Sequence, residues 1–79
     1  MFSPPDDDRI AEALMTLALE RGRQATFCPS EAARRLSDDW RPLMDHVRRV
    51  AATLPLVATQ GGAPVDPLAA KGPVRLALA

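Results

Sequence analysis

The stretch "SDDWRPLMDHVRRVAATL", residues 37–54, carries the clearest structural signal in the sequence. At 100° per residue, its apolar side chains fall within an arc of about 120°, which is the pattern of a core-facing helix. These side chains are Trp40, Leu43, Met44, Val47, Val50, Ala51 and Leu54. Asp38 or Asp39 is expected to cap the helix, and Pro42 stands within its first turn, where proline is tolerated. The stretch therefore predicts one amphipathic helix over residues 39–54.

Immediately upstream, the stretch "ATFCPSEAARRL" contains the only cysteine and predicts the start of a second helix. Pro29 fits the first helical position, where the missing N–H has no helical partner. Cys28 then becomes the N-cap and Glu31 the third helical residue, which is the spacing of a capping box. Thiol sulfur is a poor acceptor, so Glu31 is expected to do most of the capping. The helix is predicted over residues 29–36.

A first helix is predicted over residues 9–21, after an extended lead over residues 1–8. Asp7 or Asp8 is expected to accept hydrogen bonds from its first free N–H groups. Its C-terminal end is predicted at Gly22, because glycine tolerates the left-handed conformation found there.

After Pro55 the helical period stops and two β-compatible runs follow, "LVATQ" and "PVRLAL". They are joined by the Gly- and Pro-rich connection "GGAPVDPLAAKG", which predicts a hairpin with a long tip over residues 56–78. A small third strand is expected from "ATF", at the edge of this hairpin. Three helices followed by a hairpin predict a mainly α, winged helix–turn–helix fold, in a single domain over residues 1–79.

The composition restricts the possible functions. Ten basic and ten acidic residues cancel, so no net charge attracts the chain to nucleic acid or membrane. One cysteine cannot form a disulfide within the chain, and one cysteine with one histidine cannot supply the four ligands of a structural zinc site. The sequence shows no bilayer-spanning run and no secretory signal, so a cytoplasmic protein is expected. No cofactor and no small-molecule ligand are evident.

Five short motifs resemble a known family. The chain matches T-x-C-P-S-E-x-A-R from Thr26, W-R-x-L-M from Trp40, V-R-x-x-A from Val47, T-Q-x-G-x-x-V-D-P from Thr59 and K/R-G-P-I/V-R from Lys71. These motifs resemble small bacterial proteins known only as domain of unknown function 3253. One departure is the absence of a glycine between the third helix and the first strand. The resemblance implies a winged-helix fold and supplies no activity.

Basic residues on the third helix suggest a DNA interface, because this helix enters the major groove in helix–turn–helix proteins. Arginine can grip phosphates or the guanine edge in a bidentate manner. The residues expected at double-stranded DNA are Arg34, Arg35, Arg41, His46, Arg48, Arg49, Lys71 and Arg75. A second interpretation is a solvated, ion-paired face, because Asp45 lies three or four positions from several of these arginines. A third is structural: Arg48 and Arg75 clamp backbone carbonyls or Asp66 and so hold the wing.

The apolar tip "APVDPLAA" favours a different function, a contact with a protein partner or with a second copy of the chain. Leu68 is the residue expected at that interface. An enzyme is not expected, because no acid, base and nucleophile converge. Cys28 is interpreted as a capping residue, since the only candidate base, His46, lies on the outward face of another helix.

Overall fold

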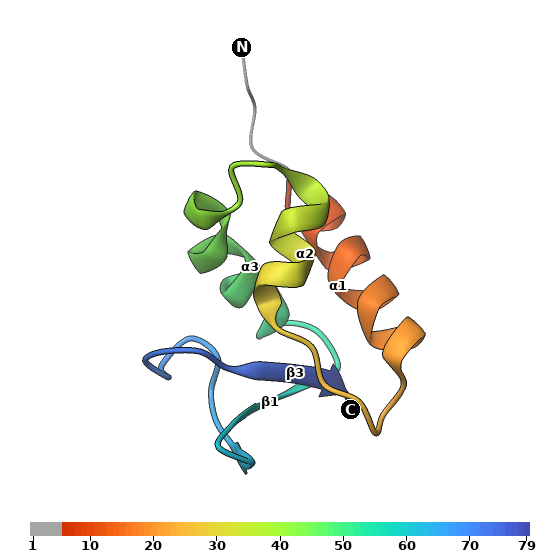
Figure 1. Ribbon diagram of the computed structural model, residues 1–79, viewed down its shortest axis with the longest axis vertical. Coiled ribbons are helices and arrows are strands. Elements are labelled where there is room, and N and C mark those ends of the chain that lie inside the picture. The colour runs from red at the N-terminus through yellow and green to blue at the C-terminus, as the bar shows by residue number, and fades with distance from the viewer. Residues whose placement is uncertain (1–5) are drawn as a thin grey trace.

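The computed structural model describes residues 6–79, so residues 1–5 of the predicted extended lead lie outside the described residues. Three helices gather on one side of the molecule, and a small antiparallel sheet lies below them (Figure 1). The elements are α1 (Asp7–Arg21), α2 (Pro29–Leu36), the 3₁₀ turn η1 (Arg41–Leu43), α3 (Met44–Ala51), β1 (Leu56–Gln60), β2 (Ala63–Pro64) and β3 (Arg75–Leu78). The mainly α winged-helix fold predicted from the sequence is confirmed.

Helix α1 begins at Asp7, earlier than the predicted Arg9, because Asp6 caps it. The Oδ1 atom of Asp6 accepts the Arg9 N–H at 2.9 Å. The prediction that Asp7 or Asp8 is the cap was therefore wrong, and both form the first helical turn instead of an extended lead. At the other end, Gly22 has a φ of 77° and donates its N–H to the Ala18 carbonyl at 2.9 Å. The predicted glycine C-cap is confirmed.

Helix α2 has the predicted bounds and the predicted cap. The Glu31 carboxylate accepts the backbone N–H of Cys28 at 3.0 Å. The Cys28 sulfur in turn accepts the Ser30 hydroxyl at 3.1 Å. Glu31 also receives the Arg21 guanidinium from the end of α1 at 2.6 Å. One carboxylate therefore starts α2 and holds it against α1.

The prediction of a continuous helix over residues 39–54 was wrong at both ends. The Ser37 hydroxyl accepts the N–H of Asp39 at 3.2 Å, which makes this segment a turn instead of a helix start. The chain then forms η1, and neither η1 nor α3 has a side-chain cap. After Ala51 the N–H groups of Thr53 and Leu54 bond to carbonyls three residues back, so the last turn is tightened.

The sheet contains a strand that the sequence did not predict. β1 pairs antiparallel with β3 as the predicted hairpin, but it also pairs with β2, giving the order β2-β1-β3. β1 and β2 are joined by Gly61 and Gly62, whose φ angles are 60° and 84°. On the other edge, Phe27 and Leu76 exchange two backbone hydrogen bonds of 2.8 Å, so "ATF" pairs at this edge as expected, but through a single bridge instead of a strand.

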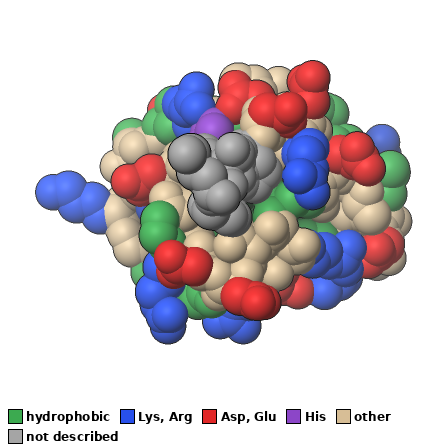
Figure 2. Space-filling model, turned by 90° about the horizontal axis from the view of Figure 1, so that it is seen from above, with side chains coloured by type: hydrophobic (Ala, Val, Ile, Leu, Met, Phe, Trp, Pro, Cys, Tyr) green, Lys and Arg blue, Asp and Glu red, His purple; other side chains and the backbone are tan. Residues whose placement is uncertain are grey.

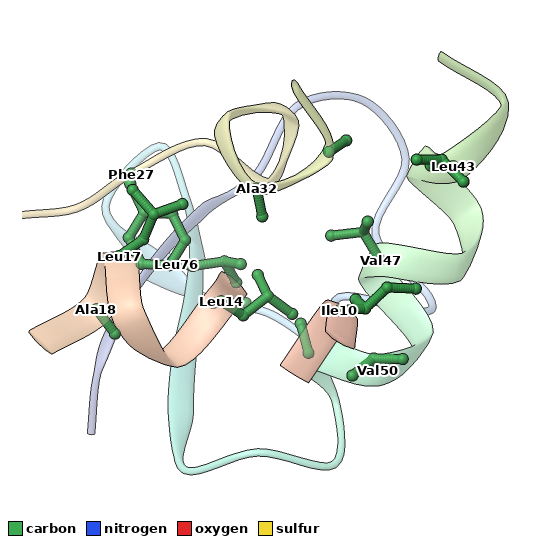
Figure 3. Close-up of a cluster of buried hydrophobic side chains, with 13 residues drawn as sticks. Ile10, Leu14, Leu17, Ala18, Phe27, Ala32, Leu43, Val47, Val50 and Leu76 are labelled. Atoms are coloured by element: carbon green, nitrogen blue, oxygen red, sulfur yellow. The ribbon is translucent and has the colours of Figure 1, made fainter. Parts of the chain in front are cut away.

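The core lies where the three helices meet the sheet. Figure 3 shows the side chains of α1 pointing toward Phe27 and Leu76 on one side and toward Val47 and Val50 on the other. Four residues of the predicted stripe are buried, namely Leu43, Val47, Val50 and Ala51, and the other three, Trp40, Met44 and Leu54, pack against the core. No polar or charged residue among those described is buried. Functional chemistry therefore has to come from the surface.

No helix within residues 6–79 is long and apolar enough to cross a membrane.

Candidate functional site

Two arginines stack on the only tryptophan, beside the turn between α2 and α3. The guanidinium carbons of Arg34 and Arg41 lie over the Trp40 ring, 4.6 and 4.7 Å from its centroid. Both arginines are exposed, and neither forms an ion pair within residues 6–79. A stacked guanidinium uses its face for the ring and keeps its in-plane N–H donors. We call Arg34, Trp40 and Arg41 the arginine stack.

Arg35, next to Arg34, has a different environment. Its guanidinium donates two hydrogen bonds to the Glu20 carboxylate, at 2.9 and 3.2 Å, and so links α2 to α1. This hydrogen bonding raises the pKa of Arg35 and lowers the pKa of Glu20. The sequence predicted Arg35 at a DNA interface, but the structure places it in this interhelical ion pair.

Arg48 and Arg75 both hold the wing, residues 56–78, against the helices. The Nη2 atom of Arg48 donates to the Gly72 carbonyl at 2.8 Å. Arg75 donates to the hydroxyl and the carbonyl of Thr26, at 3.0 and 2.9 Å. The prediction that these arginines clamp backbone carbonyls is confirmed, although only Arg48 links the wing to α3. Arg75 links it to the segment before α2.

His46 and Arg49 converge on Asp7, at the start of α1. The Nε2 atom of His46 is hydrogen-bonded to Asp7 Oδ1, and Arg49 Nη2 lies 3.5 Å from the same oxygen. The Arg49 side chain nevertheless stays 58% exposed. The ion-paired interpretation of the α3 face therefore holds for Arg49, with a carboxylate from α1 instead of Asp45, while His46 is hydrogen-bonded to the same carboxylate.

The long connection between β2 and β3, residues 65–74, is fixed by hydrogen bonds. Asp66 accepts the Leu68 N–H at 2.9 Å through its side chain, while its carbonyl accepts the N–H groups of Ala69 and Ala70. Gln60 donates to the carbonyls of Lys71 and Pro73, at 2.6 and 3.1 Å. The turn leaves Leu68 59% exposed, and Lys71 is exposed as well. Neither residue is brought to the arginine stack by a contact within the described part of the chain.

Sequence reasoning missed a cavity of about 330 Å³ between the start of α2, the start of α3 and the wing. Its walls include Cys28, Trp40, Met44, Arg48 and Val74. These residues come from three separate segments, so no local pattern indicates that they share a space.

Cys28 and His46 have separate partners. The cysteine sulfur accepts the Ser30 hydroxyl, whereas the histidine is bonded to Asp7. Across residues 6–79, no three His, Cys, Asp or Glu side chains are grouped so that they could hold a metal ion.

Acidic and basic side chains are interspersed over much of the face seen in Figure 2. This mixture agrees with the zero net charge of the sequence. Attraction of a charged partner therefore depends on local groups such as the arginine stack.

A family model described as "Protein of unknown function (DUF3253)" matches residues 7–79. The chain belongs to this family. No curated protein matches it. Because the family description names no activity, the function of this DUF3253 protein has to be argued from its surface.

Proposed function

We propose that this DUF3253 protein binds double-stranded DNA through the end of α2, η1 and α3. The observation that carries the proposal is the arginine stack, whose two guanidinium groups are exposed and free of carboxylate partners within residues 6–79. In helix–turn–helix proteins the N-terminal part of the recognition helix contacts base edges, and the preceding helix crosses the backbone. Arg41 and Arg34 stand at the corresponding positions of this chain.

Stacking on Trp40 restricts the rotamers of both arginines before phosphate binds. An unrestrained arginine loses about 2 kcal/mol of rotamer entropy when it is fixed, and a stacked one has lost part of it already. The N–H groups in the guanidinium plane stay available for bidentate bonds to phosphate oxygens. The stack therefore favours a backbone contact more than an ordinary pair of exposed arginines does.

The proposed interface is smaller than the one expected from the sequence. Arg35, Arg48 and Arg75 already bind groups of the protein, as described above. Arg49, which also pairs with Asp7, and Lys71 remain exposed and are further candidates for phosphate contacts away from the stack. With so few phosphate contacts and zero net charge, a single copy is expected to bind DNA weakly and with little sequence preference.

The test is a fluorescence-anisotropy titration of a random duplex at several salt concentrations. We expect the slope of log affinity against log salt to be reduced by about one unit in Arg34→Ala and by about one in Arg41→Ala. Arg35→Ala is the matched control. It removes the same charge from the residue next to Arg34, and this residue is already paired with Glu20. An equal effect of all three variants, or no binding at low salt, would contradict the proposal.

A second candidate function, favoured by the exposed Leu68, is contact with a second copy of the chain. The hydrogen bonds of Asp66 hold this leucine outward on an ordered turn, which reduces the entropy lost when a partner covers it. A catalytic function is not part of the proposal, because Cys28 and His46 do not meet and bind separate partners, Ser30 and Asp7.

A further inference from the structure

The cavity between α2, α3 and the wing is larger than two other hollows of the described surface. Its volume is about 330 Å³, against about 260 and 200 Å³ for the others. Known small-molecule sites occupy about 300–1,000 Å³, so this cavity is large enough for a ligand of one or two rings.

The walls of the cavity are mostly apolar. The Trp40 ring and the Met44 side chain come from the helical side, and Pro73 and Val74 come from the wing. A flat aromatic ring suits such walls, because aromatic rings also pack favourably edge to face and the methionine sulfur contacts aromatic rings favourably.

Arg48 is the only charged residue in the lining, and its hydrogen bonds are incomplete. A guanidinium has five N–H donors. The structure gives this one a single acceptor, the Gly72 carbonyl, and leaves its Nε buried without a partner among the described residues. A buried donor without an acceptor is uncommon in native proteins.

We propose that this cavity binds a small planar aromatic carboxylate, with its ring beside Trp40 and its carboxylate on Arg48. A carboxylate matches the guanidinium fork and supplies acceptors for the donors that the protein leaves unused. No acidic residue lines the cavity, so nothing in its walls repels the anion. An organic cation would meet Arg48 without a counter-charge, and a neutral ring would leave the Arg48 donors unpaired.

The site lies between α2, the start of α3 and the wing. Trp40 precedes η1, Arg48 belongs to α3, Cys28 caps α2, and the wing supplies Val74. A bound ligand would therefore hold the wing and α3 in one arrangement. The proposal does not rest on DNA binding, since every contact it uses is within the chain.

Two residues allow direct measurement of binding. Trp40 is the only tryptophan and Cys28 the only cysteine, and both line the cavity. We would titrate the protein with benzoate and follow the Trp40 fluorescence, and then measure the rate at which N-ethylmaleimide modifies Cys28 with and without benzoate. The expected result is a saturable change in fluorescence and at least a severalfold slower modification of Cys28 at saturation.

Benzyl alcohol is the matched control ligand, because it has the same ring without a charge. Arg48→Met keeps the apolar stem and removes the guanidinium, and we expect it to weaken benzoate binding at least about tenfold. Arg48→Lys, which keeps the charge without the fork, should give an intermediate loss. Far-ultraviolet circular dichroism checks that both variants are folded. A linear, non-saturating fluorescence change, unprotected Cys28, or equal binding of benzyl alcohol and benzoate would overturn the proposal, whatever the DNA titration shows.

Discussion

At the scale of the residue, Glu31 combines two interactions that stabilise the start of α2. Its carboxylate accepts the Arg21 guanidinium and the Cys28 N–H. The hydrogen bond from Arg21, and then that from Cys28, lowers the pKa of Glu31 below its ordinary value, although partial burial opposes this. A carboxylate with a lowered folded-state pKa stabilises the protein while it is ionised, and loses this contribution when it is protonated.

We predict that Glu31→Ala lowers the free energy of unfolding by about 1 kcal/mol at pH 7, the usual cost of losing a cap. The stabilisation is complete above the unfolded-state pKa of about 4.3 and disappears as the pH falls through the lowered folded-state value. The difference between wild type and variant should therefore shrink below about pH 4. Urea denaturation at several pH values measures it. Glu12→Ala, which removes an exposed carboxylate of α1 without an ion pair in residues 6–79, should show no such dependence.

The adjacent residues Arg34 and Arg35 show what the sequence alone does not predict. Arg34 and Arg35 look alike in the sequence, and both were expected at DNA. The structure gives them different partners. Arg35 binds Glu20, which lies fifteen positions away on α1, whereas Arg34 lies over Trp40, which is six positions further along the chain and beyond a turn. The capping role of Cys28 and Glu31 could be predicted, since it depends on a spacing of three residues. The environment of each arginine could not, because it depends on tertiary contacts.

At the scale of the element, the β1–β2 hairpin depends on two glycines. Gly61 and Gly62 have positive φ, and each has open space where a Cβ would stand. A substitution therefore costs backbone strain and not a steric clash. The signal was present in the sequence, since two glycines between short strands are typical of a type I′ turn. This turn is nevertheless hard to distinguish from a loop in the sequence, because Pro64 ends β2 after two residues and a Gly- and Pro-rich run indicates a loop.

We predict that Gly62→Ala lowers the free energy of unfolding by about 1–2 kcal/mol, the cost of a left-handed alanine. Gly61→Asn should be close to neutral, because asparagine followed by glycine is the preferred pair in this turn. Thermal and urea denaturation of the two variants gives the comparison. Equal losses in both would show that the glycines are needed for something other than their φ angles.

The third helix shows a different limit at the element scale. The apolar period correctly identified the buried residues Leu43, Val47 and Val50, since burial follows the position of a side chain around the helix. It did not predict the helix start, which depends on the Ser37–Asp39 hydrogen bond and on the 3₁₀ bond from Leu43 N–H to the Trp40 carbonyl. A 3₁₀ turn keeps the same side of the chain toward the core for a few residues. The stripe therefore survives although the helix begins as a 3₁₀ turn.

At the scale of the whole molecule, the wing packs Ala58 and Leu76 into the helical core, and a few polar contacts from distant residues add to this packing. Arg48 binds Gly72, Arg75 binds Thr26, and the Phe27 backbone pairs with β3. The wing thus contributes to the cavity walls and also presents Leu68 to solvent. Its two faces have different expected partners, a small carboxylate inside and a second protein copy outside.

The exposed leucine leads to a prediction about association. A chain of zero net charge has little electrostatic repulsion between copies, so apolar contacts between them are not opposed. Leu19 and Leu68 are 66% and 59% exposed, and Leu68 lies on a hydrogen-bonded turn of the wing whereas Leu19 lies on α1. If Leu68 forms the contact, sedimentation velocity should show the average mass rising with protein concentration, and Leu68→Asp should abolish the rise. Leu19→Asp adds the same charge at an equally exposed leucine of α1 and should leave the association unchanged. A constant monomeric mass at all concentrations, or equal effects of the two substitutions, would exclude the wing as the contact surface, and the arginine stack would then have to support DNA binding from single copies.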